Sequence, residues 1–247
     1  MGEKGIEINR QTCTLCFDCV EVCPSHALEQ IGKDVSVDEL MKTILKDKIY
    51  FDTSGGGITA TGGDPGLYPE FIAELFRRCR ENGISTAFDT AGAIPLWKLE
   101  GLLKYTDILY LDFKISDDRQ LHHYTGLDSK SLNASVQWIK EFKNKNSLSL
   151  RIRTPLIPEL TDNQENLLLI ARYILEIGED QIDEWELVQF NGLCADKYQK
   201  LDLAWTIPKP ESNWKMSDEL SHFLSLNCKK CQCWLPDFIN FTGKKKV

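Results

Sequence analysis

The sequence predicts an α/β fold built on a parallel sheet and preceded by a cysteine-rich segment. From residue 36 onward, helical and strand patterns alternate along the chain. Parallel neighbours need a crossover between them, so this alternation is typical of a parallel sheet. Most of the strand patterns are apolar on both faces, as expected for strands that are covered on both sides. These residues alone are compatible with an open, doubly wound sheet and with a barrel-like one.

The expected elements follow one another in a regular order. A helix over 36–47 begins with the capping box Ser36-x-x-Glu39. Strands are expected over 57–61, 85–89, 107–114, 148–154 and 184–190, and helices between them over 67–82, 95–104, 131–145 and 163–177. Beyond residue 191 the pattern weakens, and one helix is expected near 217–226.

Composition and charge exclude some classes of function. The formal net charge of −8 argues against a nucleic-acid-binding protein, because phosphates attract basic surfaces. No stretch has the length of a membrane span, and the first residues lack the apolar region of a secretory signal. We therefore expect a cytoplasmic protein with no membrane partner. In that reducing compartment, nine cysteines point to metal or redox roles rather than disulfides.

A four-cysteine motif lies near the start of the chain. Cys13, Cys16, Cys19 and Cys23 have the spacing C-x2-C-x2-C-x3-C, followed by Pro24. This spacing is typical of ferredoxin-type 4Fe–4S ligands. In proteins that use the run twice, the fourth cysteine serves the other cluster. Cys23 then either completes the cluster of the other three cysteines or belongs to a second one.

Polar residues stand at the end of each expected strand. In parallel α/β folds these ends meet at one rim, where ligands bind. The glycines after the first strand allow a ligand to approach the backbone closely. The candidate binding residues at this rim are Gly62, Gly63, Asp64, Asp89, Thr90, Asp112, Lys114, Arg153 and Asn191.

Several of these segments resemble the glycyl-radical-enzyme activating enzymes, which belong to the radical S-adenosylmethionine (SAM) superfamily and include pyruvate formate-lyase activase. The resemblance is carried, in the family's order, by SGGGITATGGDP (54–65), DTAG (89–92), DFK (112–114), YTG (124–126), RIRTPLIP (151–158) and ELVQFN (186–191). It covers residues 5–205. It implies a partial parallel (β/α) barrel of the radical SAM type, here missing its first strand, with a ferredoxin-like insert at the N-terminus. The expected domains are 1–34 for the 4Fe–4S segment, 35–205 for the barrel and 206–247 for a C-terminal extension.

The resemblance also implies roles for the candidate residues. Gly62 to Asp64 resemble the loop that holds the amino group of SAM. Asp89 and Asp112, with Thr90 beside them, resemble residues near the SAM carboxylate and a monovalent cation. Lys114 and Arg153 match positions near the cofactor, and Asn191 stands where pyruvate formate-lyase activase has a histidine.

The resemblance further implies the cofactors and partners. The cofactors are a 4Fe–4S cluster and SAM, whose reductive cleavage gives a radical that removes hydrogen from a glycine. The partners are a glycyl radical enzyme and a flavodoxin or ferredoxin-type electron donor, under anaerobic conditions.

The sequence departs from the family pattern in its cysteines. The family binds its radical cluster through C-x3-C-x2-C, and this spacing is absent from the sequence. We therefore expect a truncated activating protein that is inactive alone, with no catalytic residue of its own. A smaller departure is Asp64, which replaces the family's glutamate.

Two other functions remain as alternatives. One is a non-catalytic 4Fe–4S electron-transfer or partner-binding protein derived from the family. The other is an aldolase-like enzyme with Lys114 as Schiff-base nucleophile.

The remaining cysteines and histidines have less specific interpretations. Cys228, Cys231 and Cys233 form a possible metal site, with Cys194 as a candidate fourth ligand. Cys79 is expected in the core, His122 and His123 in a loop, and His26 at the surface.

Overall fold

The computed structural model describes residues 6–178, 181–190, 192–205, 207 and 231–234. The chain divides into two compact units, Met1–Leu40 and Met41–Val247. Within the described residues, no helix is long and apolar enough to cross a membrane.

The first unit contains the four-cysteine motif and little regular structure. Its helix α1 spans Asp18–Glu21, and α2 (Val37–Ile44) begins at its end. The predicted capping box is confirmed, because the Glu39 amide donates to Ser36 Oγ at 3.2 Å and the Ser36 amide donates to Glu39 Oε2 at 2.8 Å. No side chain between residues 6 and 40 is buried. This unit therefore has no hydrophobic core among its described residues.

The second unit is organised around a parallel sheet with the strand order β1-β2-β3-β4-β5-β6. The strands are β1 (Gly57–Ala60), β2 (Ser85–Thr90), β3 (Ile108–Asp112), β4 (Ser149–Leu156), β5 (Glu184–Gln189) and β6 (Cys231–Trp234). The first five confirm the predicted strands. Neighbours in the sequence are neighbours in the sheet, and β1 and β6 are its two edges within the described residues. The sheet is therefore open, as a partial barrel requires.

The sixth strand was not predicted from the sequence. It lies in the segment that was expected to be a C-terminal extension, and it pairs with β5 in parallel. Its sequence, CQCW, was interpreted only as part of a metal motif. The helix expected near 217–226 and Cys228 lie outside the described residues.

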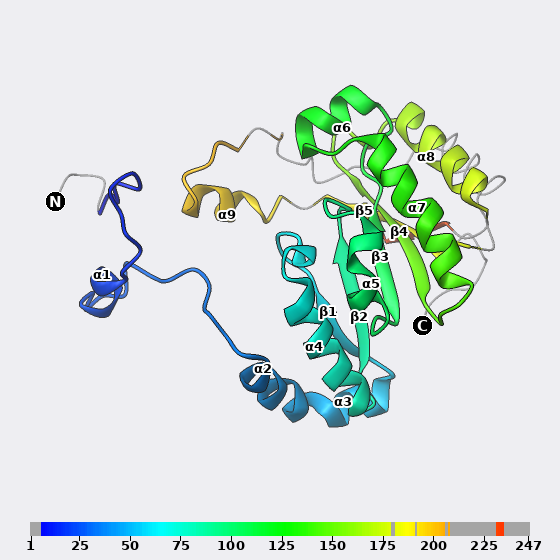
Figure 1. Cartoon of the computed structure of the whole chain (residues 1–247). Helices are drawn as coiled ribbons and strands as arrows, with labels where there is room; N and C mark the ends of the chain where they lie inside the picture. The colour runs from blue at the N-terminus through cyan, green and yellow to red at the C-terminus, as the bar shows by residue number, and fades with distance from the viewer. Residues whose placement is uncertain (1–5, 179–180, 191, 206, 208–230, 235–247) are drawn as a thin grey trace. The chain divides into compact units, whose positions relative to one another are not determined.

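Helices pack on one face of the sheet (Figure 1). They are α4 (Pro69–Glu81), η3 (Leu96–Leu99) with α5 (Glu100–Leu103), α6 (Asp118–Thr125), α7 (Ser129–Lys143) and α8 (Gln164–Ile177). The short elements η1 (Leu45–Asp47), α3 (Lys48–Ser54), η2 (Pro65–Leu67) and α9 (Ala195–Lys200) complete the described structure. The placement of His122 and His123 in a loop was wrong: they belong to α6, which begins at the N-cap Asp117.

Buried and half-buried side chains alternate along the strands, so that one face of the sheet lies in the core and the other face is polar. In β4 exposure alternates strictly, so that Leu150, Ile152 and Thr154 are buried while Arg151 and Arg153 are half-buried on the other face. Trp185 of β5 is fully buried, and its Nε1 donates to Thr154 Oγ1 at 3.0 Å. The apolar face packs under the helices and fixes the strands. The opposite face then holds the polar side chains together.

Gly57 allows β1 to approach β2 closely. A Cβ atom at this position would lie 2.0 Å from the Ser85 carbonyl oxygen, so any other residue would displace the strand. Gly57, the last glycine of the run and the first residue of β1, thus has a packing role.

Candidate functional site

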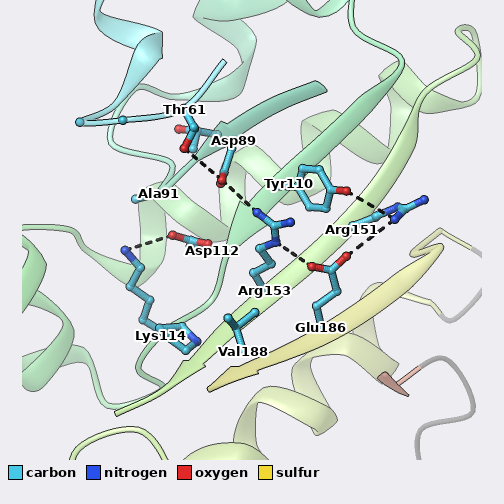
Figure 2. Close-up of a pocket in the computed structure, with 14 residues that line it drawn as sticks. Thr61, Asp89, Ala91, Tyr110, Asp112, Lys114, Arg151, Arg153, Glu186 and Val188 are labelled. Carbon is cyan, nitrogen blue, oxygen red and sulfur yellow. Dashed lines mark hydrogen bonds and ion pairs between the residues drawn. The ribbon is translucent and has the colours of Figure 1, made fainter. Parts of the chain in front are cut away.

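A cavity of about 860 Å³ opens among β1 to β5 on the polar face of the sheet (Figure 2). Each of these strands, or the loop directly after it, contributes to its lining. The lining residues are Thr61, Gly62, Gly63, Asp89, Thr90, Ala91, Tyr110, Asp112, Lys114, Arg151, Arg153, Pro155, Glu186 and Val188. Its volume is in the range of pockets that bind small-molecule cofactors.

The structure brings most of the predicted site residues together. The seven that line the cavity are Gly62, Gly63, Asp89, Thr90, Asp112, Lys114 and Arg153. Gly62 has a φ of 136°, and a Cβ atom at Gly62 or Gly63 would meet open space. The backbone of this glycine pair therefore faces the cavity without side chains in between. Asn191 lies outside the described residues.

Asp64 is the one described candidate that is absent from the lining. Its Oδ1 accepts from the Gly66 amide at 2.9 Å and caps η2, while its Oδ2 accepts from Thr90 Oγ1 at 2.8 Å. Thr90 Oγ1 accepts in turn from the Gly92 amide at 3.0 Å. The carboxylate of Asp64 thus joins the loop after β1 to the end of β2. Its contact with an amino group stays a prediction.

Arg153 is the centre of the charged network in the cavity. Its Nη1 donates to Asp89 Oδ2 at 3.0 Å, and its Nε donates to Glu186 Oε2 at 2.7 Å. The guanidinium carbon lies 3.7 Å from the centroid of the Tyr110 ring, a close cation–π contact. Three strands, β2, β3 and β5, therefore hold one side chain of β4 (Figure 2).

A second arginine extends this network. Arg151 Nη1 lies 2.9 Å from Glu184 Oε2 and 3.7 Å from Glu186 Oε1, and it donates to the Tyr110 hydroxyl at 3.4 Å. On the other side of the cavity, Lys114 Nζ lies 3.0 Å from Asp112 Oδ2. Positive and negative groups alternate around the cavity.

Sequence reasoning missed Tyr110, Arg151 and Glu186. A signal was present for two of them, because Tyr110 stands two residues before Asp112 and Arg151 stands two residues before Arg153. Glu186 is the β5 partner of Arg153, which only the sheet register shows. In a strand such positions share a face. The apolar neighbours of these residues concealed the pattern.

The ionisation of the two central groups follows from this packing. Burial raises the pKa of Asp89 above its ordinary value, the Asp112 carboxylate raises it further, and Arg153 opposes both effects. Burial lowers the pKa of Arg153, but the hydrogen bond and charge of Glu186 outweigh it and raise the pKa overall. Arg153 is thus a permanent cation in the cavity.

The four cysteines of the first unit are free thiols. Cys13, Cys16 and Cys19 are exposed, and Cys23 is half-buried with its Sγ accepting from the Ala27 amide at 3.2 Å. Four thiols at this spacing match the donor set of a 4Fe–4S cluster. Among the described residues, no three Cys, His, Asp or Glu side chains converge as a metal site. In the described conformation the thiols are accessible but not gathered.

The other cysteines and His26 have the following positions. Cys79 is buried in α4, as expected, and its Sγ lies 3.7 Å from Met41 Sδ. His26 and Cys194 are exposed. Cys231 and Cys233 belong to β6, so the possible metal site of the C-terminal cysteines stays a prediction.

Comparison with protein-family profiles shows the superfamily to which the chain belongs. The profile of the Radical SAM superfamily matches residues 18–170, and that of a 4Fe–4S binding domain matches residues 6–28. The chain belongs to the radical SAM superfamily. Membership implies an iron–sulfur cluster and SAM as cofactors. The ion-paired Lys114 and this membership leave no observation in favour of an aldolase.

Three curated radical SAM relatives activate enzymes. The (2S)-3-sulfopropanediol dehydratase activating enzyme of Klebsiella oxytoca is 36% identical over 85% of this chain and 65% of its own length. The pyruvate formate-lyase-activating enzyme of Clostridium pasteurianum is 36% identical over 71% of each chain. The pyruvate formate-lyase 2-activating enzyme of Escherichia coli K12 is 32% identical over 81% of this chain and 67% of its own. This chain thus spans about two thirds of the length of these activating enzymes for glycyl radical enzymes.

Solved structures of radical SAM proteins share the fold. A domain of pyruvate-formate lyase-activating enzyme from Bacteroides vulgatus superimposes with a TM-score of 0.53 at 20% identity, over 72% of this chain and 98% of that domain. Streptococcus suis SuiB bound to S-adenosylmethionine gives a TM-score of 0.59 at 12% identity, over 87% of this chain and 47% of SuiB. At these identities the likeness concerns the fold alone.

Proposed function

We propose that this chain is a glycyl-radical-enzyme activating protein whose cavity binds SAM. The observation that carries the proposal is the cavity at the strand ends, which combines an exposed glycine backbone with carboxylates and cations. SAM carries an ammonium, a carboxylate and a sulfonium, so it needs partners of both signs. The alternation of Asp112, Lys114, Asp89 and Arg153 supplies them.

Each group has a role that follows from its chemistry. The carbonyl groups of Gly62 and Gly63 accept hydrogen bonds from the ammonium. Asp89 and Asp112, with Thr90 beside them, line the carboxylate end of SAM and a nearby monovalent cation. Lys114 and Arg153 bind the carboxylate as cations. When bound, SAM and a reduced cluster would supply the radical chemistry that activates the protein substrate.

We further propose that the 247-residue chain does not cleave SAM alone. A cluster that activates SAM leaves one iron open, and it needs three thiolates at the family's spacing. That spacing is absent from the sequence, whereas Cys13, Cys16, Cys19 and Cys23 match a cluster closed by four thiolates. The proposal is that these 247 residues are a truncated form of an activating enzyme and that the three thiolates come from residues outside them.

The proposed partners follow from this function. They are a glycyl radical enzyme as protein substrate and a flavodoxin or ferredoxin-type electron donor, in an anaerobic cytoplasm. The acidic net charge of −8 does not favour nucleic acid as a further partner.

A single preparation tests both parts of the proposal. The 247-residue chain is reconstituted with iron and sulfide, reduced with dithionite and supplied with SAM. We expect saturable SAM binding by calorimetry and no 5′-deoxyadenosine by chromatography. The full-length pyruvate formate-lyase-activating enzyme of Clostridium pasteurianum serves as the positive control for cleavage.

Each of the two measurements can contradict one part of the proposal without deciding the other. Detection of 5′-deoxyadenosine with the chain alone would contradict the proposed dependence on outside thiolates. Absence of SAM binding would contradict the assignment of the cavity and would favour a 4Fe–4S electron-transfer or partner-binding protein, which the accessible four-cysteine motif also supports.

A further inference from the structure

Glu186 is a buried carboxylate on the cavity face with no role in the proposal above. Its side chain is only 6% exposed, and its two oxygens contact two different arginines, Arg153 at 2.7 Å and Arg151 at 3.7 Å. A buried carboxylate is costly unless it is paired. Its position opposite Arg153 in the β4–β5 register makes this pairing a property of the fold.

Three contacts define the plane of the Arg153 guanidinium. Glu186 binds its Nε, Asp89 binds its Nη1, and the Tyr110 ring lies against its face at 3.7 Å. Within the described part of the chain, these hydrogen bonds use Nε and Nη1. The N–H groups of Nη2 therefore remain for a ligand in the cavity.

We infer that Glu186 and Tyr110 are positioning residues that hold Arg153 in one orientation, with Nη2 ready for the carboxylate of the bound molecule. This inference rests on the proposed function, since it takes SAM as that molecule. Glu186 fixes the rotation of the guanidinium through Nε, and Tyr110 fixes its tilt. An arginine held in this way loses less freedom when the ligand binds than a mobile one does.

Arg151 has a supporting part in this arrangement. Asp89 and Glu186 place two negative charges around Arg153, and a second cation near Glu186 balances them. Glu184 in turn pairs with Arg151 at 2.9 Å. Glu184 and Glu186 thus form a matched pair: both are buried glutamates of the same strand that contact Arg151, and Glu186 also binds Arg153 Nε.

The first test compares Glu186→Gln with Glu184→Gln in the full 247-residue chain. The Nε–H signal of Arg153 is observed by ¹⁵N NMR and assigned by its loss in Arg153→Lys. We expect Glu186→Gln to shift this signal and to accelerate its exchange with water, because the ionised acceptor of the hydrogen bond becomes a neutral amide oxygen. Glu184→Gln leaves it in place. SAM affinity is expected to fall about tenfold in Glu186→Gln and less than about twofold in Glu184→Gln.

The second test separates the ring from the hydroxyl of Tyr110. Tyr110→Phe keeps the ring against Arg153 and removes only the hydroxyl that contacts Arg151. Tyr110→Leu removes the ring. We expect Tyr110→Leu to change the chemical shift of the Arg153 signal and to weaken SAM binding, with Tyr110→Phe close to the wild-type protein in both measurements.

The possible results are distinct. Equal effects of Glu186→Gln and Glu184→Gln on the Arg153 signal would overturn the inference, because they would show a general effect of buried charge. An unchanged signal in Glu186→Gln would overturn it as well. If the wild-type chain does not bind SAM but the Arg153 signal responds as expected, the positioning role stands and the proposed function fails.

Discussion

The four-cysteine unit and the barrel differ in what can hold them together. Between residues 6 and 40 no side chain is buried, and the cysteine side chains are exposed or half-buried. In the barrel, side chains such as Phe76, Phe88 and Trp185 are fully buried, and each parallel strand is fixed by its neighbours. The barrel contains its own source of stability. We expect the cysteine unit to depend on a bound cluster, as small metal-binding segments often do.

The difference teaches that the cavity and the four-cysteine motif have different origins. The cavity is formed by packing alone, before any ligand binds. The proposed cluster site is expected to form only when iron and sulfide gather the thiols. Three experiments test this comparison, from the largest expected effect to the smallest.

Replacing one ligand of the cluster affects the cysteine unit only. In Cys16→Ser we expect complete loss of bound 4Fe–4S cluster, measured as iron, sulfide and visible absorption, because a closed cluster needs all its thiolates. The free energy of unfolding of the barrel is expected to stay within about 0.5 kcal/mol of the wild-type value in urea. Cys194→Ser, which removes an exposed thiol outside the motif, is the control. A destabilised barrel in Cys16→Ser would contradict the separation of the two units.

Cys79 represents the cysteines of the packed unit. Burial raises the pKa of its thiol from 9.0 to about 11. In the unfolded chain the thiol loses its proton at the ordinary value, so stability falls as pH rises between the two values. The loss amounts to about 2 to 3 kcal/mol, at about 1.4 kcal/mol per pKa unit.

The measurement is urea unfolding as a function of pH, compared with Cys79→Ala. In Cys79→Ala, this fall of the unfolding free energy with rising pH is expected to be absent. In the metal-free native protein, maleimide labelling should modify Cys13, Cys16 and Cys19 and spare Cys79. Labelling of Cys79 as fast as that of Cys13, Cys16 and Cys19 would mean that the thiol in the packed unit is as accessible as those of the cysteine unit.

The smallest effect concerns the connection between two cavity loops. Thr90 donates to Asp64 at 2.8 Å. In a double-mutant cycle with Asp64→Ala and Thr90→Val, we expect a coupling free energy of about 1 kcal/mol in urea unfolding. The pair Asp64→Ala and Thr61→Val is the control, because Thr61 donates to Asp89 instead. Additive effects for both pairs would contradict the proposed connection.

Much of the fold could be predicted because its signals are local. Five strands were recognised from short apolar runs, and the helices that became α4, α7 and α8 from their periodicity. The helix expected over 95–104 formed as the short elements η3 and α5, and α6 was missed, since its eight residues include few apolar ones. β6 was missed because its partner β5 is some forty residues earlier in the chain.

Part of the site could also be predicted because its signals are local in the sequence. Asp89, Asp112 and Arg153 were found from their place at strand ends. Glu186 and Tyr110 were missed, because what matters about them is the arginine that they contact across the sheet. For Asp64 the sequence predicted a contact with a ligand. It could not show that the Asp64 carboxylate accepts a hydrogen bond from Thr90.

The sequence by itself determined the alternation of strands and helices, the set of polar residues at the strand ends and the four-thiol donor set. Each of these depends on residues that are close together in the chain. Only the tertiary structure decided that one arginine is held by three strands, that Asp64 joins two loops, and that Cys231–Trp234 completes the sheet beside β5. These features depend on which strands become neighbours, and that choice is made by packing across the whole sheet.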